Sequence, residues 1–252
     1  MAKTHSKNVR VLFGGTNLSG DSRDIGNIGL QYDTVEVHGF AADYKERLMG
    51  HADAMFGPYQ ALFNDTPADV GPVEAGSHIT LNGIGEPIAS VFIGEGAAPA
   101  IGDVAYSQTT AQTSYTVTGT NTDAVTINAD FTTRADGGFA GWGRALAVGA
   151  SISSTTSLAS VDNGAQTTAG ATAVLHLTRS VGTMGTNDWA ITLEDSANGT
   201  DWAALGAAFT GDGGAVTAEL QTISGTIRRY VRAVATKTAG NYIIIWINLI
   251  RN

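Results

Sequence analysis

The chain has 252 residues, enough for one large β domain or two domains of ordinary size. Only 15% of its residues are charged, against about 25% in typical soluble proteins, while 43% are hydrophobic. The chain contains no cysteine, which excludes disulfides, thiolate nucleophiles and cysteine-bound metals. Because so weakly charged a surface is unusual, we expect other chains to cover part of it.

The negative charge is concentrated in the first part of the chain. Residues 1–149 hold 8 Lys and Arg against 16 Asp and Glu, whereas residues 150–252 hold 6 against 7. DNA-binding surfaces need basic side chains to neutralise phosphates, so this field opposes attachment to nucleic acid. The first ten residues lack the apolar core of a signal peptide, and the apolar run at 243–247 is too short to span a bilayer. We expect a protein that stays in a cytoplasm until it joins a larger particle.

Most of the first part has the alternating pattern of half-buried strands. In residues 124–131, Val125, Ile127, Ala129 and Phe131 share one face and polar residues the other. The same reasoning predicts strands at 9–13, 34–37, 78–82, 89–93, 112–118 and 142–148. One short helix is predicted at 58–63, where Pro58 suits a first helical position. Residues 43–49 fit a helical turn or a loop equally well.

The composition shifts to Ser, Thr, Ala and Gly near residue 150, which predicts a boundary between a domain of residues 1–149 and one of residues 150–252. Strands are predicted in the second part at 171–178, 188–194, 203–209, 215–222, 226–235 and 242–250, a spacing typical of a β-sandwich. Asn198-Gly199 is a strong hairpin signal between the second and third of them.

Two stretches resemble the tail tube proteins of siphophages, especially those of actinobacteria. The first is Val11–Asp21 (VLFGGTNLSGD), followed by Tyr32–Val37 (YDTVEV) and Arg47–Phe56 (RLMGHADAMF). The second comprises Val174–Thr178 (VLHLT), Ile191–Trp202 (ITLEDSANGTDW) and Arg229–Ala233 (RYVRA). Each motif is weak alone, but their order along two thirds of the chain is more specific. Asp195 stands where the family has histidine.

The resemblance implies an all-β fold: a tail-tube-like β-sandwich or barrel with one short helix, followed by a small immunoglobulin-like or jelly-roll-like β-sandwich on the tube exterior. It implies a structural virion protein that forms stacked, hexameric rings with copies of itself. Such a major tail protein is assembled in the bacterial cytoplasm and becomes part of the phage tail. Its partners would be the tape measure and tail terminator proteins. DNA would pass through the lumen at genome ejection without specific binding.

A channel that conducts DNA should repel phosphates, and four carboxylates on or beside predicted strands are candidates for its wall: Asp33, Glu36, Asp53 and Asp130. Ordinary solvated carboxylates are the alternative for each. Residues 1–10 could form an arm that orders on assembly, and residues 41–50 could reach a neighbouring ring. Arg228, Tyr230 and Arg232 share a predicted strand face and are candidates for contacts between subunits, or for a solvated face.

Enzymatic and cofactor signatures are missing from the sequence. The five histidines show no metal-ligand spacing, and no nucleophile elbow or phosphate-binding loop is present. Asp195, Asn198 and Asp201 suit a turn better than a calcium site. We therefore predict no catalytic activity, metal or cofactor. The alternative function is a carbohydrate-binding or virion decoration module, which would rest on Trp189, Trp202 and Trp246. A cell-wall hydrolase is a more distant possibility, because no carboxylate pair stands out.

Overall fold

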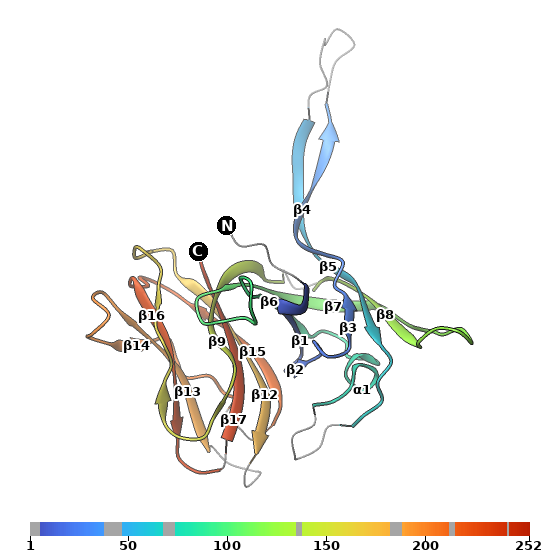
Figure 1. Ribbon diagram of the computed structural model, residues 1–252. Coiled ribbons are helices and arrows are strands. Elements are labelled where there is room, and N and C mark those ends of the chain that lie inside the picture. Colours follow the sequence, from blue (N-terminus) through green and yellow to red (C-terminus); the bar gives the residue numbers. More distant parts are fainter. Residues whose placement is uncertain are drawn as a thin grey trace.

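The computed structural model describes residues 6–37, 47–67, 74–134, 138–181, 188–211, 215–240 and 242–252, and nearly all of its regular structure is antiparallel β-sheet. The predicted all-β class is confirmed. The strands form a large central sheet, a second sheet that continues into a projecting arm, and a small five-stranded sheet (Figure 1).

The central sheet holds strands from both parts of the chain. In spatial order its strands are β15 (Thr217–Ile223), β12 (Ala171–Val181), β17 (Tyr242–Arg251), β9 (Ala140–Ile152), β7 (Val104–Thr118), β6 (Ile88–Ile93), β1 (Val9–Phe13) and β2 (Thr16–Asn17). Strand β9 runs through residue 150 and pairs with β7 on one side and β17 on the other. The two predicted domains therefore share one sheet, while their division at residue 150 remains a prediction.

The central sheet curls so strongly that strands far apart in its order meet across its concave side. His176 of β12 lies 2.7 Å from Ser90 of β6, although three strands separate β12 from β6. At the two ends, Gly15 lies against the backbone of Thr217, where a Cβ would come within 2.6 Å of the carbonyl oxygen. Gly15 also has φ +94°, so glycine is required at this closure for two independent reasons.

The second sheet includes the projecting arm. It packs against the face of β1 and β6 that is opposite the concave side of the central sheet. It consists of β4 (Asn27–Glu36), β5 (Arg47–Leu62), β8 (Thr126–Thr133) and the second half of β7, with short β3 (Ser22–Asp24) beside β5. Strand β7 belongs to both sheets because it pairs with β6 and β9 up to Thr109 and with β8 from Thr110 onward.

Aromatic side chains fill the core between these two sheets. Phe13 of β1 is fully buried, and its ring lies 5.3 Å from Phe56, 5.0 Å from Tyr59 and 4.9 Å from Phe131. The apolar sides of β5 and β8 thus pack on β1, and their other sides face outward. This core fixes which face of the second sheet is exposed.

The third sheet forms a sandwich with the last strands of the central sheet. It contains β10 (Thr156–Ser157), β11 (Val161–Asp162), β13 (Trp189–Ser196), β14 (Ala203–Leu205) and β16 (Tyr230–Lys237). Trp189 is buried in the core between the layers, and Trp246 is buried on the concave side of the central sheet. The predicted hairpin is present, since Gly199 at φ +78° lies in the turn that joins β13 to β14.

The predicted positions of a helix and of one strand are wrong. Residues 58–62 are the end of β5, in which Tyr59 and Ala61 are buried alternately and Pro58 falls at a bulge, where a missing N–H is tolerated. The helix, α1, is instead Ser77–Leu81, where a strand is predicted. A carboxylate oxygen of Asp21, distant in sequence, accepts the Ser77 backbone N–H at 3.0 Å, so a tertiary contact stabilises this helix.

A chain of buried polar groups crosses the concave side of the central sheet. Ser90 Oγ lies 2.7 Å from both His176 Nε2 and Ser107 Oγ, and Asn248 Nδ2 donates to Ser107 at 2.9 Å. His176 is completely buried, and this burial lowers its pKa to about 3. The imidazole is therefore neutral in the folded protein across the ordinary pH range.

Replacing His176 should change how stability depends on pH. The unfolded imidazole binds a proton below about pH 6.5 and the folded one only near 3, so stability falls as pH falls through this window, by up to about 1.4 kcal/mol per unit. Urea unfolding of the wild type and His176→Gln at pH 7, 6 and 5 measures this slope. The variant should show a shallower slope, and equal slopes would contradict the assignment.

Candidate functional site

The second sheet has two open edges in the described part of the chain. Strand β4 forms ladder hydrogen bonds with β5 alone, and the second half of β7 forms them with β8 alone. On its other side, β7 makes only two backbone bonds near the start of this half, from Thr110 to Pro87 and from Gln112 to Gly85. Unpaired strand edges are templates for pairing with another chain.

The outward face of this sheet is polar and carries no basic side chain on β4, β7 or β8. Cross-strand Gln60 and Asn128 are joined by a 3.0 Å hydrogen bond, and Asp130 accepts from Ser114 at 2.6 Å. Arg47 is the only Lys or Arg in the sequences of β4, β5, β8 and the second half of β7. Apart from Arg23 of β3, which lines a hollow with Gln60 at the end of the sheet, this face presents carboxylates, amides and hydroxyls.

The four predicted lumen carboxylates all lie on this sheet. Asp33 and Glu36 are on β4, Asp53 is on β5 and Asp130 is on β8, and all four are exposed. Asp53 and Asp130 line the same hollow of about 210 Å³ on the outward face. Asp33 follows Gln31, the cross-strand partner of Asp53, by two residues, so it shares that face.

Glu36 is placed differently from the other three. It stands an odd number of residues from Asp33, so alternation puts it on the opposite face of β4. Its cross-strand partner is Arg47. The structure thus brings three of the four predicted residues onto one face, and the lumen role of each remains a prediction.

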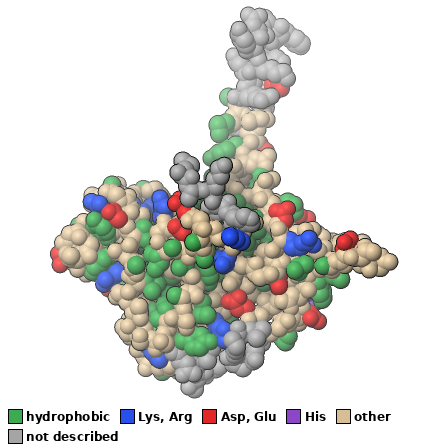
Figure 2. Space-filling model, in the orientation of Figure 1, with side chains coloured by type: hydrophobic (Ala, Val, Ile, Leu, Met, Phe, Trp, Pro, Cys, Tyr) green, Lys and Arg blue, Asp and Glu red, His purple; other side chains and the backbone are tan. Residues whose placement is uncertain are grey.

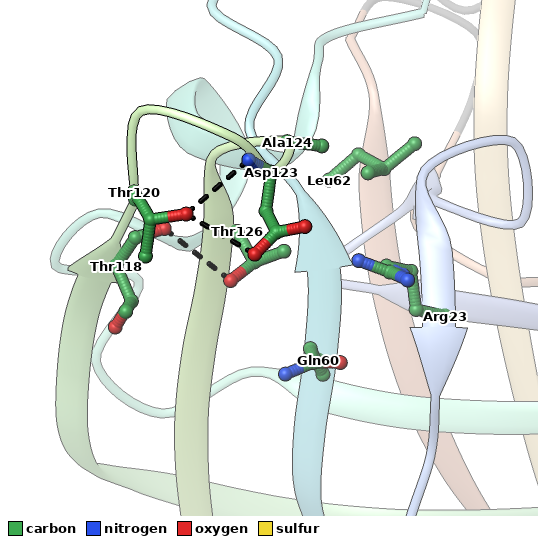
Figure 3. A pocket seen from close by; sticks show the side chains of 9 residues that line it. Arg23, Gln60, Leu62, Thr118, Thr120, Asp123, Ala124 and Thr126 are labelled. Carbon is green, nitrogen blue, oxygen red and sulfur yellow. Dashed lines mark hydrogen bonds between the residues drawn. The ribbon is translucent and has the colours of Figure 1, made fainter.

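A larger hollow of about 530 Å³ opens at the end of the sheet where β5 stops (Figure 3). Arg23 of β3 lies on one side of it, and Asp123 of the β7–β8 loop lies on the other. The Asp123 backbone N–H and carboxylate both hydrogen-bond to Thr120 Oγ1, at 3.2 and 3.1 Å, which holds the loop in shape. Leu62, 38% exposed, contributes apolar surface to the hollow.

Strands β4 and β5 extend past the core as an arm that projects from the body (Figure 1). The side of the arm that continues the core face carries Leu30, Tyr32 and Met49, which are 51%, 46% and 69% exposed. We call these three residues the arm stripe. Sequence reasoning missed it, although the alternation of Ile28, Leu30 and Tyr32 signals an apolar face.

Most of the predicted loop at 41–50 lies outside the described residues, as do residues 1–5 of the predicted amino-terminal arm. Residues 47–50 belong to β5 and therefore to the projecting arm. Residues 6–8 form a short 3-10 helix and residues 9–13 are β1, so the described part of the segment 1–10 joins the body.

The predicted contact residues Arg228, Tyr230 and Arg232 lie at the third sheet. Tyr230 and Arg232 are on the outer face of β16, whereas Arg228 precedes the strand, and its backbone N–H donates to Asp195 at 2.8 Å. Arg232 pairs with Glu194 at 2.7 Å, and its guanidinium lies 4.1 Å from the centre of the Trp202 ring. The two arginines thus pair with Asp195 and Glu194 of the same chain, and the role of the three residues between subunits stays a prediction.

Two of the residues considered for calcium, Asn198 and Asp201, are part of a turn, whereas Asp195 lies in β13 and accepts the Arg228 backbone N–H. Asn198 Oδ1 accepts the N–H groups of Thr200 and Asp201, and its Nδ2 donates to the Asp201 carboxylate at 2.7 Å. In the part of the chain that the structure describes, no group of three or more His, Asp or Glu side chains could hold a metal ion. No described helix is long and apolar enough to cross a membrane.

Comparison with known proteins gives only remote likenesses. No family model matches the chain, and no curated protein matches it. Among solved structures it is similar to the Dit protein of phage SPP1, described as a paradigm of the hub adsorption apparatus in phages that infect Gram-positive bacteria. The identity is 8%, the TM-score is 0.31, and the match covers 96% of this chain and 99% of that one.

The structure of infectious bursal disease virus, Gx strain, is similar at 12% identity and a TM-score of 0.27, covering 98% of this chain and 68% of that one. Both similar proteins belong to viruses. At these TM-scores, neither likeness assigns this chain to a family.

Removing Arg232 should destabilise the third sheet more than removing Arg229. Arg232 is 23% exposed and covers Trp202, so Arg232→Ala should cost about 1 kcal/mol of unfolding free energy. Arg229 makes a bidentate pair with Asp162 at 2.6 and 2.7 Å, but the two side chains are 45% and 43% exposed, so Arg229→Ala should cost less than Arg232→Ala. Urea denaturation of both variants is the measurement, and equal losses would contradict this account.

Proposed function

We propose that the chain is a structural subunit of a long-tailed phage, a major tail tube protein whose copies form stacked rings. Neighbouring copies in a ring pair the open edges of β4 and β7, so that their second sheets join into one continuous wall. The observation that carries this proposal is a polar sheet with one face on the core, the other exposed, and two open edges. The similarity of the sequence motifs to siphophage tail tubes supports it.

In this proposal the outward face of the second sheet lines the lumen. Asp33, Asp53 and Asp130 then face the channel, where carboxylates repel phosphate and prevent the counterion-releasing contacts that retain DNA. Serine, threonine and asparagine side chains between the carboxylates are polar and add no positive charge that would hold phosphate. DNA passes without specific binding, and the third sheet with its sandwich lies on the tube exterior.

The same proposal gives the arm a place between rings. Its apolar stripe is exposed in the single chain (Figure 2), and exposed apolar patches mark contacts with other proteins. The number of subunits in a ring is proposed as six from the family resemblance. Tape measure and tail terminator proteins are the further partners that this role requires.

The alternative is a carbohydrate-binding or decoration module built on the third sheet. Sugar stacking needs an open aromatic face, but one face of Trp202 is covered by Arg232, and Trp189 and Trp246 are buried. Negative-stain microscopy at high protein concentration separates the two functions. Rings or hollow rods of uniform width support the tube, whereas small particles that bind a polysaccharide column support the module.

Reversing the charge of the proposed lumen should make the tube retain DNA. Asp53→Lys combined with Asp130→Lys places lysines on both sides of the same hollow, and we expect the assembled variant to bind double-stranded DNA at low salt, unlike the wild type. Fluorescence anisotropy of a labelled duplex with assembled protein measures this binding. Glu95→Lys with Asp201→Lys, at exposed sites away from the second sheet, is the charge-matched control. Equal DNA binding by both variants would contradict the lumen assignment.

A further inference from the structure

Three Asn-Gly pairs lie in connections between elements of the described chain, at residues 82–83, 163–164 and 198–199. The backbone nitrogen that follows an asparagine can attack the side-chain amide, and glycine favours this attack because it has no Cβ to obstruct the approach. The three glycines have nearly the same φ, +73°, +78° and +78°. Differences in reactivity among the pairs therefore come from what holds the side-chain amide and the glycine N–H in place.

The pair in the β13–β14 turn is held at both reacting groups. Asn198 Nδ2 donates to the Asp201 carboxylate at 2.7 Å, and Asn198 Oδ1 accepts the N–H groups of Thr200 and Asp201. The Gly199 N–H donates to Ser196 Oγ at 3.0 Å. Attack of this nitrogen on the side-chain amide would break hydrogen bonds at the nucleophile and at the group that leaves.

The pair after β11 is held in the same way by other partners. Asn163 Nδ2 donates to the Arg229 carbonyl at 3.1 Å, and the Gly164 N–H donates to the Asp162 carboxylate at 2.8 Å. That carboxylate also pairs with the Arg229 guanidinium at 2.6 Å, which fixes the acceptor. Both reacting groups of this pair are therefore restrained.

The pair after α1 has none of these restraints. Both Asn82 and Gly83 are exposed, and among the described residues neither the Asn82 side chain nor the Gly83 N–H has a hydrogen-bond partner. A Cβ added at Gly83 would meet no atom within 4 Å. Attack requires rotation about ψ of Asn82, which is 96°, and the bond that spans this turn, from the Ile84 N–H to the Leu81 carbonyl, is long at 3.4 Å. The rotation therefore meets little resistance.

We propose that Asn82 is a site of spontaneous deamidation, and that the hydrogen bonds at Asn163 and Asn198 protect those two residues. The Gly83 backbone nitrogen loses its proton and attacks Asn82 Cγ. A bond forms between this nitrogen and Cγ, closing a succinimide ring, and the Cγ–Nδ2 bond breaks as ammonia leaves. Water then opens the ring at either carbonyl to give aspartate or isoaspartate. The conversion releases ammonia, consumes water and involves no oxidation or reduction.

The modified residue lies close to the edge of β7 that the proposed rings use. The Gly85 carbonyl accepts the Gln112 N–H of β7 at 2.8 Å. The Pro87 carbonyl likewise accepts the Thr110 N–H at 2.9 Å. Isoaspartate adds a carbon to the main chain just before these contacts, and both products add a negative charge. This consequence, unlike the modification itself, rests on the proposed function: modified chains should pair less readily at β7.

Mass spectrometry of native and denatured protein tests the site. The full chain is incubated at mildly alkaline pH with and without guanidinium chloride, and then digested with pepsin in acid, where deamidation is slow. The mass increase from amide to acid is followed in the peptide that contains each asparagine. In the native protein Asn82 should react at least about tenfold faster than Asn163 or Asn198, because those residues must first break two or more hydrogen bonds. In guanidinium chloride the three rates should be similar.

The variant Asn82→Gln is the control and should remove the fast reaction of the native protein. A native rate at Asn82 no higher than the rates at the other two residues would overturn the proposal. A difference that persists in guanidinium chloride would overturn it as well, because the sequence around each pair, and not the fold, would then set the rates.

The consequence for assembly is measured on the same incubated protein. The sample is concentrated, rings and rods are separated from unassembled chains by sedimentation, and the modified fraction at residue 82 is compared between the two. We expect enrichment of about two- to fivefold among unassembled chains, the range that one unfavourable pair between strands produces. Equal fractions overturn this consequence alone. Absence of rings and rods from fresh wild-type protein overturns the proposed function and leaves the reactive site at Asn82 standing.

Discussion

The rest of the account depends on the unpaired backbone groups along β4 and the second half of β7. A strand edge that faces water keeps its N–H and C=O groups solvated, and pairing with another chain replaces those water contacts with a ladder. The core beneath the sheet, centred on Phe13, fixes the orientation of both edges and of the polar face between them.

The curled central sheet provides the rigid support for these edges. Its ends approach at Gly15 and Thr217, and the buried chain from His176 to Asn248 ties β12, β6, β7 and β17 together. Strand β7 passes from this sheet into the second one, so the position of the open edge is coupled to the curl. The same curl places the third sheet on the side away from the arm (Figure 1).

Sequence periodicity predicted strands such as β8 and β13, because burial on one face enforces alternation there. It failed at residues 58–62, where Pro58 suits a helix start as well as a strand bulge, and at α1, whose first N–H is satisfied by Asp21 from elsewhere in the chain. No local pattern contains such a contact. The arm formed by β4 and β5 was also unpredicted: Ile28, Leu30 and Tyr32 of β4 alternate, but Gly50 and Gly57 interrupt the pattern of β5.

For the candidate site, the carboxylates were predictable as residues but not as a group. Asp33, Asp53 and Asp130 come from three strands, and only the register between those strands shows that they share a face while Glu36 does not. The arm stripe required knowing where the core ends, because Leu30 and Tyr32 continue the face of partly buried Ile28 without being covered themselves.

Hydrogen–deuterium exchange of dilute and concentrated protein tests the central claim most directly. In dilute solution the amides of residues 27–36 and 113–118 should exchange rapidly on their unpaired sides, and in the assembled protein they should be protected. The amides of β12 and β17, already paired within the chain, should exchange equally in both samples. Protection of the unpaired-side amides of β4 and β7 in the dilute monomer, or no gain of their protection on assembly, would contradict the account.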